Sequence, residues 1–199
     1  MKDLVQRLGV TLAARPARRV ERPEARRAAV AVLVTSGADP AILFIRRKER
    51  AGDPWSGQMA FPGGFTSSSD ASLEATSLRE TEEETGLPPH AARPLGALDE
   101  VSPRTPYLPP LIITPYVFGV DSELATRPGP EVEATVWLKV RDLFDPARRR
   151  PYRLTFRAAA GEGDGRVESR EFESIVIGSY VIWGLTERVL QQLGELAAL

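Results

Sequence analysis

The 199-residue sequence contains no cysteine and a single histidine, His90. The absence of cysteine excludes disulfides, zinc–thiolate centres, iron–sulfur clusters and a cysteine nucleophile. A Ser-His-Asp triad or a histidine-based metal centre would have to depend on His90, which follows Pro88-Pro89 in an expected turn. We therefore expect any chemistry to use carboxylates, arginines and a hard metal ion.

The sequence also lacks a long apolar run and a large excess of either charge. No stretch approaches 18 consecutive apolar residues, and the N-terminus lacks the apolar segment and cleavage site of a secretory signal. The formal net charge is −1. We therefore expect a cytoplasmic protein that binds neither membranes nor nucleic acid.

Residues 1–27 differ in composition from the rest of the chain. They hold eight Lys or Arg residues against three acidic residues, which leaves the remainder acidic. Apolar spacing predicts a helix over residues 4–12, and an irregular link with Pro16 and Pro23 follows it. The pattern favours a solvated N-terminal helix and basic arm, and an anion-binding arm is the alternative. Residues 28–199 are expected to form one globular domain.

Strand and helix patterns alternate along that domain without an internal repeat. Strands are predicted over residues 28–35 and 41–47, as a hairpin, and over 94–101, 111–120, 132–138, 152–158 and 167–177. One helix is predicted to start at a cap, Asp70 or Ser72, and to end near Thr85, with Gly86 just beyond it. Residues 48–60 are expected to form a loop, and 179–196 an amphipathic helix that buries Trp183. This order predicts the α/β class, with a mixed sheet covered by helices.

The most informative segment is the end of the first of these helices, Leu78-Arg79-Glu80-Thr81-Glu82-Glu83-Glu84-Thr85-Gly86. At about 100° per residue, Glu80, Glu83 and Glu84 share one face, and Glu82 points away. Because like charges at this spacing destabilise a helix, that face is expected to meet either open water or a cation. The upstream Gly63-Gly64 would let the backbone approach a hard cation such as Mg²⁺. A solvated acidic helix is the alternative.

This segment resembles the signature of the Nudix hydrolase family, G-x5-E-x7-R-E-U-x-E-E-x-G-U, in which U is a bulky aliphatic residue. Residues 79–80, 83–84, 86 and 87 match it at the right spacing, with Gly64 as the leading glycine. Asp70 stands in place of the first glutamate, eight residues follow it instead of seven, and Thr81 occupies the first U position.

The eight-residue spacer after an aspartate resembles the coenzyme A pyrophosphatase branch of that family. The same branch has an upstream motif ending in Gly-x3-Phe-Pro-Gly-Gly, matched by residues 57–64, and a C-terminal Trp-Gly-Leu-Thr like residues 183–186. Its upstream motif expects an arginine where this chain has Asp53.

The resemblance implies a Nudix-type α/β/α sandwich and hydrolysis of a diphosphate bond, with coenzyme A or its derivatives as the substrate. A Nudix hydrolase of ADP-ribose, a dinucleotide or a nucleoside triphosphate is one alternative. A Nudix module that senses a nucleotide without cleaving it is another. In each case the expected partner is a nucleotide-type small molecule.

The resemblance also implies roles for individual residues. Glu80 and Glu84 would bind Mg²⁺ or Mn²⁺, with the carbonyl of Gly63 or Gly64 completing the site. Glu83 would be a further ligand or the base that activates water. Arg79 would orient these carboxylates.

Several residues outside the signature are further candidates for the site. Glu131 is a second candidate for the base, and a rim carboxylate is its alternative. Arg46, Arg47 and Arg50 could bind a phosphate, or they could be exposed loop residues. Trp55, Tyr107 and Tyr116 could stack on an adenine, but the pattern favours core or rim packing for each of them.

Overall fold

The structure, a computed structural model, describes residues 3–51, 56–103, 110–157 and 167–199. Its main sheet has seven strands, with β1 (Arg26–Thr35) at the centre. The others are β2 (Ala41–Arg47), β3 (Met59–Ala60), β4 (Gly63–Phe65), β5 (Arg93–Ala97), β6 (Leu111–Val120) and β7 (Val132–Lys139). The order is β3-β2-β1-β6-β5, with β4 paired to β1 and β7 paired to β2. The sheet is mixed because β1 and β6 are parallel while the other pairs are antiparallel.

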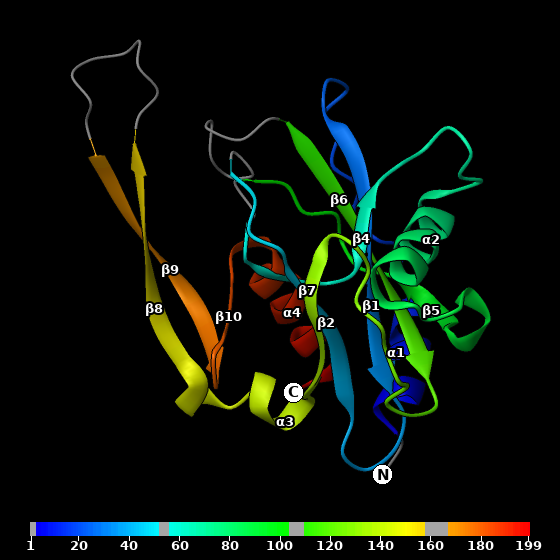
Figure 1. Cartoon of the computed structure of the whole chain (residues 1–199). Helices are drawn as coiled ribbons and strands as arrows, with labels where there is room; N and C mark the ends of the chain where they lie inside the picture. The colour runs from blue at the N-terminus through cyan, green and yellow to red at the C-terminus, as the bar shows by residue number, and fades with distance from the viewer. Residues whose placement is uncertain (1–2, 52–55, 104–109, 158–166) are drawn as a thin grey trace.

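A second, antiparallel sheet stands beside the first (Figure 1). It consists of β8 (Arg149–Arg157), β9 (Val167–Ile177) and β10 (Tyr180–Trp183), in the order β10-β9-β8. A short helix, α3 (Val140–Leu143), and a 3₁₀ turn over Pro146–Arg148 connect β7 to β8. Another 3₁₀ turn, Pro89–Ala91, precedes β5.

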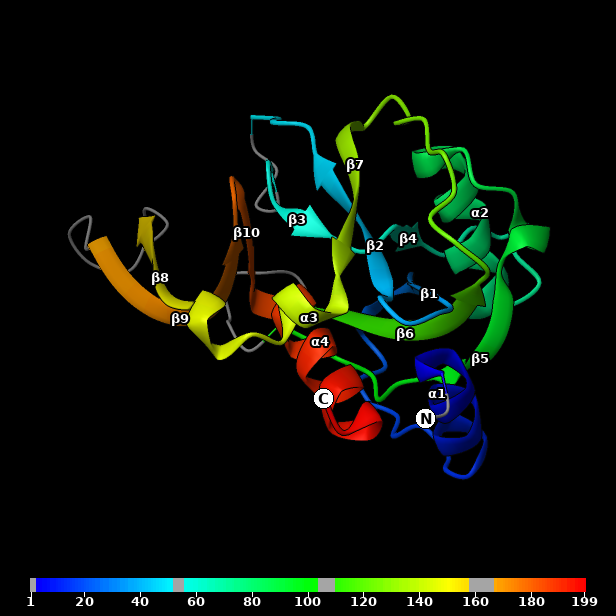
Figure 2. The ribbon, with the colours of Figure 1, turned by 90° about the horizontal axis from the view of Figure 1, so that it is seen from below.

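Helices cover both faces of the main sheet (Figure 2). Helix α2 (Leu73–Thr85) packs on one face, and α1 (Leu4–Ala13) and α4 (Gly184–Ala197) lie on the other. Side chains of β1 alternate between the two faces, as a strand requires. Ala31 and Leu33 pack in the cluster beneath α2, whereas Val32 and Val34 pack in the cluster that contains α1 and α4. This confirms the predicted α/β/α arrangement with a mixed sheet.

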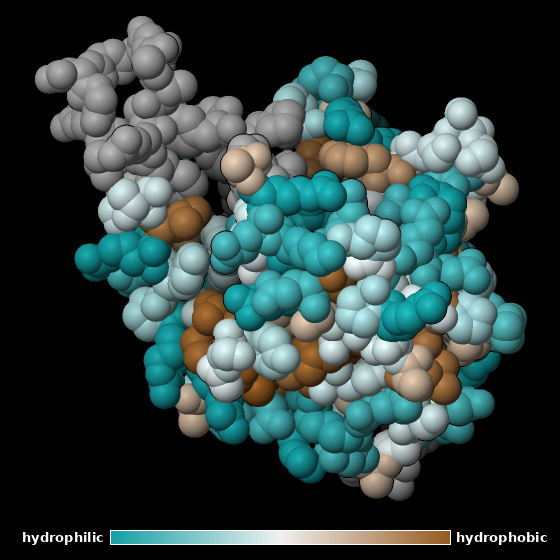
Figure 3. All heavy atoms as spheres, viewed as in Figure 1, coloured by the Kyte–Doolittle hydropathy of each residue, from teal (hydrophilic) through white to brown (hydrophobic). Residues whose placement is uncertain are grey.

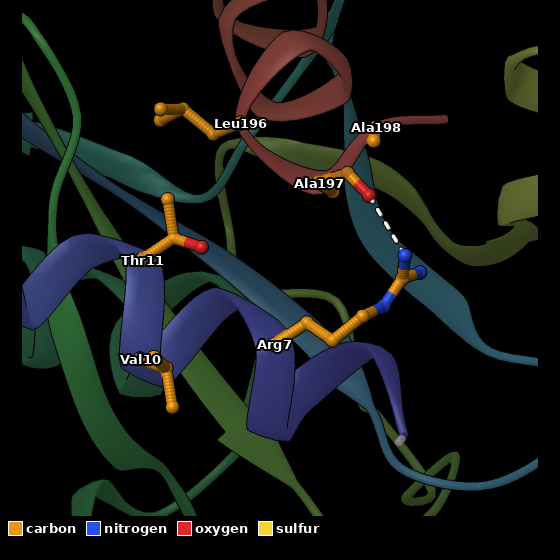
Figure 4. Close-up of a pocket in the computed structure, with 6 residues that line it drawn as sticks. All are labelled: Arg7, Val10, Thr11, Leu196, Ala197 and Ala198. Carbon is orange, nitrogen blue, oxygen red and sulfur yellow. Dashed lines mark hydrogen bonds between the residues drawn. The ribbon is translucent and has the colours of Figure 1, made fainter. Parts of the chain in front are cut away.

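The first and last helices of the chain contact each other. The apolar face of α1 is buried in the cluster that holds the inner face of α4, through Leu4, Val5, Leu8 and Leu12. At the end of α4, the Ala197 carbonyl accepts a hydrogen bond of 2.9 Å from Arg7 Nη1 (Figure 4). The N-terminal helix therefore contributes to the same core as the sheet.

Most predicted elements are found close to their expected positions, and three need correction. The predicted closing helix is divided, because residues 180–183 pair with β9 after a turn at Gly178 and α4 begins only at Gly184. Trp183 is therefore the last residue of a strand and is half-buried. The predicted loop 48–60 contains β3, and the strand predicted over 94–101 ends at Ala97. In the described part of the chain, no helix combines the length and the apolar character needed to cross a membrane.

Candidate active site

Helix α2 has a well-defined start and end. Ser72 caps its first turn, because its Oγ accepts a hydrogen bond of 3.1 Å from the Ala75 amide. Gly86 ends the helix in the left-handed conformation (φ 72°) and donates to the Glu82 carbonyl at 2.8 Å. Of the two predicted caps, Ser72 is therefore correct. The helix packs against β1 and β4, so its inner face meets the double glycine.

The double glycine is required because two groups approach its backbone closely. A Cβ atom on Gly64 would lie 2.5 Å from Cδ of Glu80, and one on Gly63 (φ 152°) would lie 2.3 Å from the Ala29 carbonyl oxygen. The Gly63 amide donates to Glu84 Oε2 at 2.9 Å. The backbone of β4 thus touches both inner carboxylates of α2.

Arg79 connects the other acidic groups of the site. Its Nε and Nη2 donate to the two carboxylate oxygens of Asp70 at 2.8 and 3.0 Å, a bidentate arrangement. Its Nη1 donates to Glu80 at 2.9 Å and to Glu83 at 3.2 Å. The Asp70 carboxylate also accepts from the Ser67 amide and the Thr76 hydroxyl, both at 2.8 Å. Asp70 therefore holds the Arg79 guanidinium in place, and that guanidinium in turn binds Glu80 and Glu83.

The glutamates of the helix differ strongly in exposure. Glu84 is only 8% exposed, and the Glu80 side chain is 18% exposed. The Glu83 side chain is 59% exposed, and Glu82 is exposed without contributing to the site. Solvent exposure on the predicted shared face therefore increases from the buried Glu84 through Glu80 to the exposed Glu83.

Burial changes the protonation of the inner carboxylates. It raises the pKa of Glu84 to about 7, an effect that the Gly63 amide and Arg47 partly oppose and that the charge of Glu80 increases. Burial also raises the pKa of Glu80, although Arg79 opposes the shift. The pKa of Asp70 is lowered, chiefly by its hydrogen bonds with Arg79. Two carboxylates that are costly to ionise side by side are typical of a site that receives a cation.

The donor atoms fit a hard divalent ion. The side-chain donors are carboxylate oxygens of Glu80 and Glu84, and a Cβ on Gly64 would fill the space beside Glu80. Within the described ranges, no three Asp, Glu or His side chains are arranged to hold one ion together. Mg²⁺ in proteins is commonly held by one or two carboxylates, with waters and substrate phosphates as the remaining ligands.

A loop that precedes β7 is attached to the C-terminal end of α2. The Gly129 amide donates to the Glu84 carbonyl at 2.9 Å, and a Cβ on Gly129 would lie 2.2 Å from the Glu83 carbonyl oxygen. Glu131 follows in this loop with its side chain 56% exposed. The structure thus places the second candidate base near the helix that carries the first.

The three candidate phosphate-binding arginines have different surroundings. Arg46 lies 3.3 Å from a carboxylate oxygen of Glu133, and Arg50 lies 3.0 Å from one of Glu131. Arg47 is close enough to Glu84 to lower the pKa of that carboxyl. Among the three, Arg47 therefore has a direct electrostatic link to the inner carboxylates.

The aromatic candidates and the histidine add little to this site. Trp55 and Tyr107 lie outside the described residues. Tyr116 is half-buried on the α2 side of the sheet, and Arg19 partly offsets the rise that burial causes in its pKa. His90 is exposed in a 3₁₀ turn.

The sequence interpretation missed two contacts that define the site. Asp70 was considered only as a cap or as a replacement in the signature, not as the partner of Arg79. The hydrogen bond from Gly63 to Glu84 was also missed. The sequence offers only an indirect signal, an aspartate nine residues before an arginine, because such a pair can form an ion pair.

The surface that covers β7 and α2 in Figure 3 is mostly hydrophilic. Brown, apolar residues are seen mainly as separate patches in that view.

Comparisons with known proteins agree with this geometry. The family model of the NUDIX domain matches residues 25–158. A relative from Citrobacter koseri named "Uncharacterized Nudix hydrolase NudL" is 32% identical over 170 residues, which cover 84% of this chain and 81% of the relative. A protein of the same name from Salmonella paratyphi B is 31% identical over 169 residues, with the same coverage.

A solved structure shares the fold. The chain resembles the crystal structure of a MutT/nudix family protein from Enterococcus faecalis with a TM-score of 0.57 at 19% identity. The match covers 88% of this chain and 63% of the other, so this chain spans less than two thirds of that protein.

Proposed function

The chain belongs to the Nudix family, and from this premise we propose that it hydrolyses the diphosphate bond of coenzyme A or a derivative of it. The observation that carries the proposal is the contact of the Gly63-Gly64 backbone with Glu80 and Glu84, because it brings two carboxylates together at one point of β4. A diphosphate is repelled by bare carboxylates, so such a site needs a divalent cation between the two.

In the proposed site, Glu80 and Glu84 hold Mg²⁺ or Mn²⁺ together with the Gly64 carbonyl. The ion, when bound, neutralises charge on the phosphate oxygens and lowers the pKa of a water molecule. Arg79, clamped by Asp70, keeps Glu80 and Glu83 in one orientation. Glu83 is exposed enough to reach a water molecule and acts as the base, with Glu131 as the alternative.

The reaction adds one water molecule across the diphosphate. The water oxygen bonds to one phosphorus, its proton passes to Glu83, and the bridging bond on the opposite side of that phosphorus breaks. Little covalent chemistry falls to the protein, so its contribution is mainly the positioning of charged groups.

Two segments that resemble the coenzyme A pyrophosphatase branch contact each other in the fold. Thr186, in the C-terminal motif, donates from Oγ1 to the Met59 carbonyl in the upstream motif at 3.1 Å. The upstream motif then leads through Phe61, which stacks on Phe44 with ring centroids 4.9 Å apart, into Gly63-Gly64. This link between the branch motifs and the inner carboxylates supports coenzyme A as the substrate.

The test is a panel of diphosphate compounds with Mg²⁺ and with Mn²⁺, with products separated by chromatography. Coenzyme A should give adenosine 3′,5′-bisphosphate and phosphopantetheine, at a higher kcat/KM than ADP-ribose, dinucleotides or nucleoside triphosphates. If one of those compounds is cleaved with a higher kcat/KM than coenzyme A, that compound is the substrate and the coenzyme A proposal is wrong. Nucleotide binding without cleavage of any compound would favour a sensing module.

A further inference from the structure

A second charged cluster lies outside the inner carboxylates, where the N-terminal arm crosses the sheet. The Glu100 side chain is fully buried and accepts hydrogen bonds from Arg19 Nη1 at 3.0 Å, from Arg27 Nη2, and from Thr114 Oγ1 at 3.0 Å. The Val20 amide donates to its other oxygen at 2.7 Å. One buried carboxylate thus holds two guanidinium groups in place.

These two arginines face a groove. Its cavity of about 610 Å³ is lined by residues 19–23 and 25, by Arg27, and by Leu73 at the start of α2. The side chains of Arg19 and Arg27 are 54% and 39% exposed, although each is tied to a buried partner. A guanidinium has five N–H donors, so each fork keeps donors that Glu100 does not use. Arg22 adds a third guanidinium, paired only with Glu24 at 3.3 Å among the contacts of the described chain.

The groove is close to the inner carboxylates. Ala29 of β1 pairs with Gly64, the residue whose backbone meets Glu80. Arg27 precedes Ala29 by two residues, so their Cα atoms are about 7 Å apart along the strand. Residues two apart on a strand share a face. Leu73 precedes Glu80 by seven residues on α2, which is about 10 Å along the helix.

We propose that Arg19, Arg22 and Arg27 bind a phosphate monoester of the substrate that is not cleaved. The inference rests on the proposed function, under which this group is the 3′-phosphate of coenzyme A. One ribose ring separates the 3′-phosphate from the 5′-diphosphate, which matches the short step from the groove to the double glycine.

The local chemistry favours a monoester over a general anion. Three arginines and Glu21 line the groove, and Glu24 and Glu100, which pair with these arginines, balance the remaining charge, so long-range attraction is weak. Recognition then depends on the donors of the arginines, whose planar forks match the oxygens of a terminal phosphate. Because Glu100 already orders two of these side chains, little conformational entropy is lost on binding.

The experiment compares wild type, Arg22→Ala and Arg18→Ala. Arg22 is the suitable position because it does not contact the buried Glu100, so its removal should not disturb folding. Arg18 lies on the same arm, with its side chain 89% exposed and paired with Asp99, and serves as the control. We measure kcat/KM for coenzyme A and for dephospho-coenzyme A, and by calorimetry the Kd of adenosine 3′,5′-bisphosphate, AMP and inorganic phosphate.

The wild type should prefer coenzyme A to its dephospho form by about tenfold or more, the effect of losing one charged contact. Arg22→Ala should reduce that ratio severalfold and should raise the Kd of adenosine 3′,5′-bisphosphate but not that of AMP. Arg18→Ala should match wild type in both measurements. An unchanged ratio in Arg22→Ala would overturn the proposal while leaving the hydrolase activity intact. Inorganic phosphate that binds as tightly as the bisphosphate would also overturn it, in favour of a free-anion site.

Failure of the proposed function is recognised separately. If the wild type does not cleave coenzyme A, the calorimetric arm still decides whether the groove binds a 3′-phosphate. Equal Kd values for adenosine 3′,5′-bisphosphate and AMP in the wild type would then reject the groove as well.

Discussion

Arg79 and Asp70 form a two-point ion pair, with Nε 2.8 Å from Oδ1 and Nη2 3.0 Å from Oδ2. The pair raises the pKa of Arg79 and lowers that of Asp70, so both groups stay charged. Because the fork is held on one side, Nη1 is directed to Glu80 and Glu83 on the other. We therefore propose that Arg79 acts through geometry and not only through charge.

This relationship predicts the effect of Arg79→Lys. A lysine keeps the charge but cannot reproduce the fork, so metal affinity should change little while kcat falls about 10- to 100-fold. Asp70→Asn should lower kcat in the same way, because it loosens the same guanidinium. Turnover and metal titration on both variants are the measurements. Full activity in Arg79→Lys would leave Arg79 as a counter-charge for the glutamates.

Glu83 and Glu82 provide a matched pair on one helix. Both are exposed, but only Glu83 contacts Arg79. Glu83→Gln keeps the shape and removes the base, so kcat should fall about 100-fold or more, whereas Glu82→Gln should be silent. If Glu131→Gln causes the large loss instead, the base lies in the loop before β7.

The double glycine makes a steric prediction. In Gly64→Ala the new methyl group would lie 2.5 Å from Cδ of Glu80, so the carboxylate must move. We expect at least a tenfold loss of metal affinity with the fold retained, as measured by calorimetry and circular dichroism. Gly9→Ala is the control, since its Cβ would lie 3.6 Å from the nearest side chain, and alanine is favoured in a helix. Unchanged metal affinity in Gly64→Ala would remove this contact from the site.

The pKa of Glu84 predicts how stability depends on pH in the absence of metal. Its folded pKa of about 7 is above the ordinary value of 4.5 for a glutamate, so the folded state binds the proton more tightly. The stability from this group is present in full below pH 4.5 and is lost as the pH rises through 7. Glu84→Gln should therefore be more stable than wild type at pH 8 in EDTA, by at most about 3 kcal/mol.

The measurement is the free energy of unfolding of both proteins at pH 4.5 and at pH 8. The difference between them should be small at the lower pH, since Glu84 is then protonated and resembles glutamine. A difference of equal size at the two pH values would show that Glu84 ionises normally in the folded protein. Divalent metal should stabilise the wild type at pH 8 and Glu84→Gln much less.

Local signals explain which elements could be predicted from the sequence. Ser72 and Gly86 define both ends of α2 because capping depends on a few neighbouring residues. The run Tyr180-Val181-Ile182-Trp183 was placed in a helix, because a short apolar run has no period that distinguishes a helix from a buried strand. Only its pairing with β9 decides the question.

The residues of the site also fall into those that a local pattern indicates and those that only the fold brings together. The helix pattern and the family signature place Glu80, Glu84 and Arg79 on one helix, whereas Asp70 and Gly63, which contact Arg79 and Glu84, lie outside that helix. Arg19 and Glu100 are 81 residues apart, and no local pattern indicates that they meet. The division of the chain into residues 1–27 and 28–199 stays a prediction.

We propose that the Gly63-Gly64, Glu80 and Glu84 cluster is a metal-dependent centre of diphosphate hydrolysis. The most direct test is the rate of adenosine 3′,5′-bisphosphate release from coenzyme A by wild type and by Glu80→Gln/Glu84→Gln, each with Mg²⁺ or Mn²⁺ and with EDTA. We expect release by the wild type with metal, none with EDTA, and a loss of at least about 1000-fold in the double variant. Near-normal release by the double variant would contradict it.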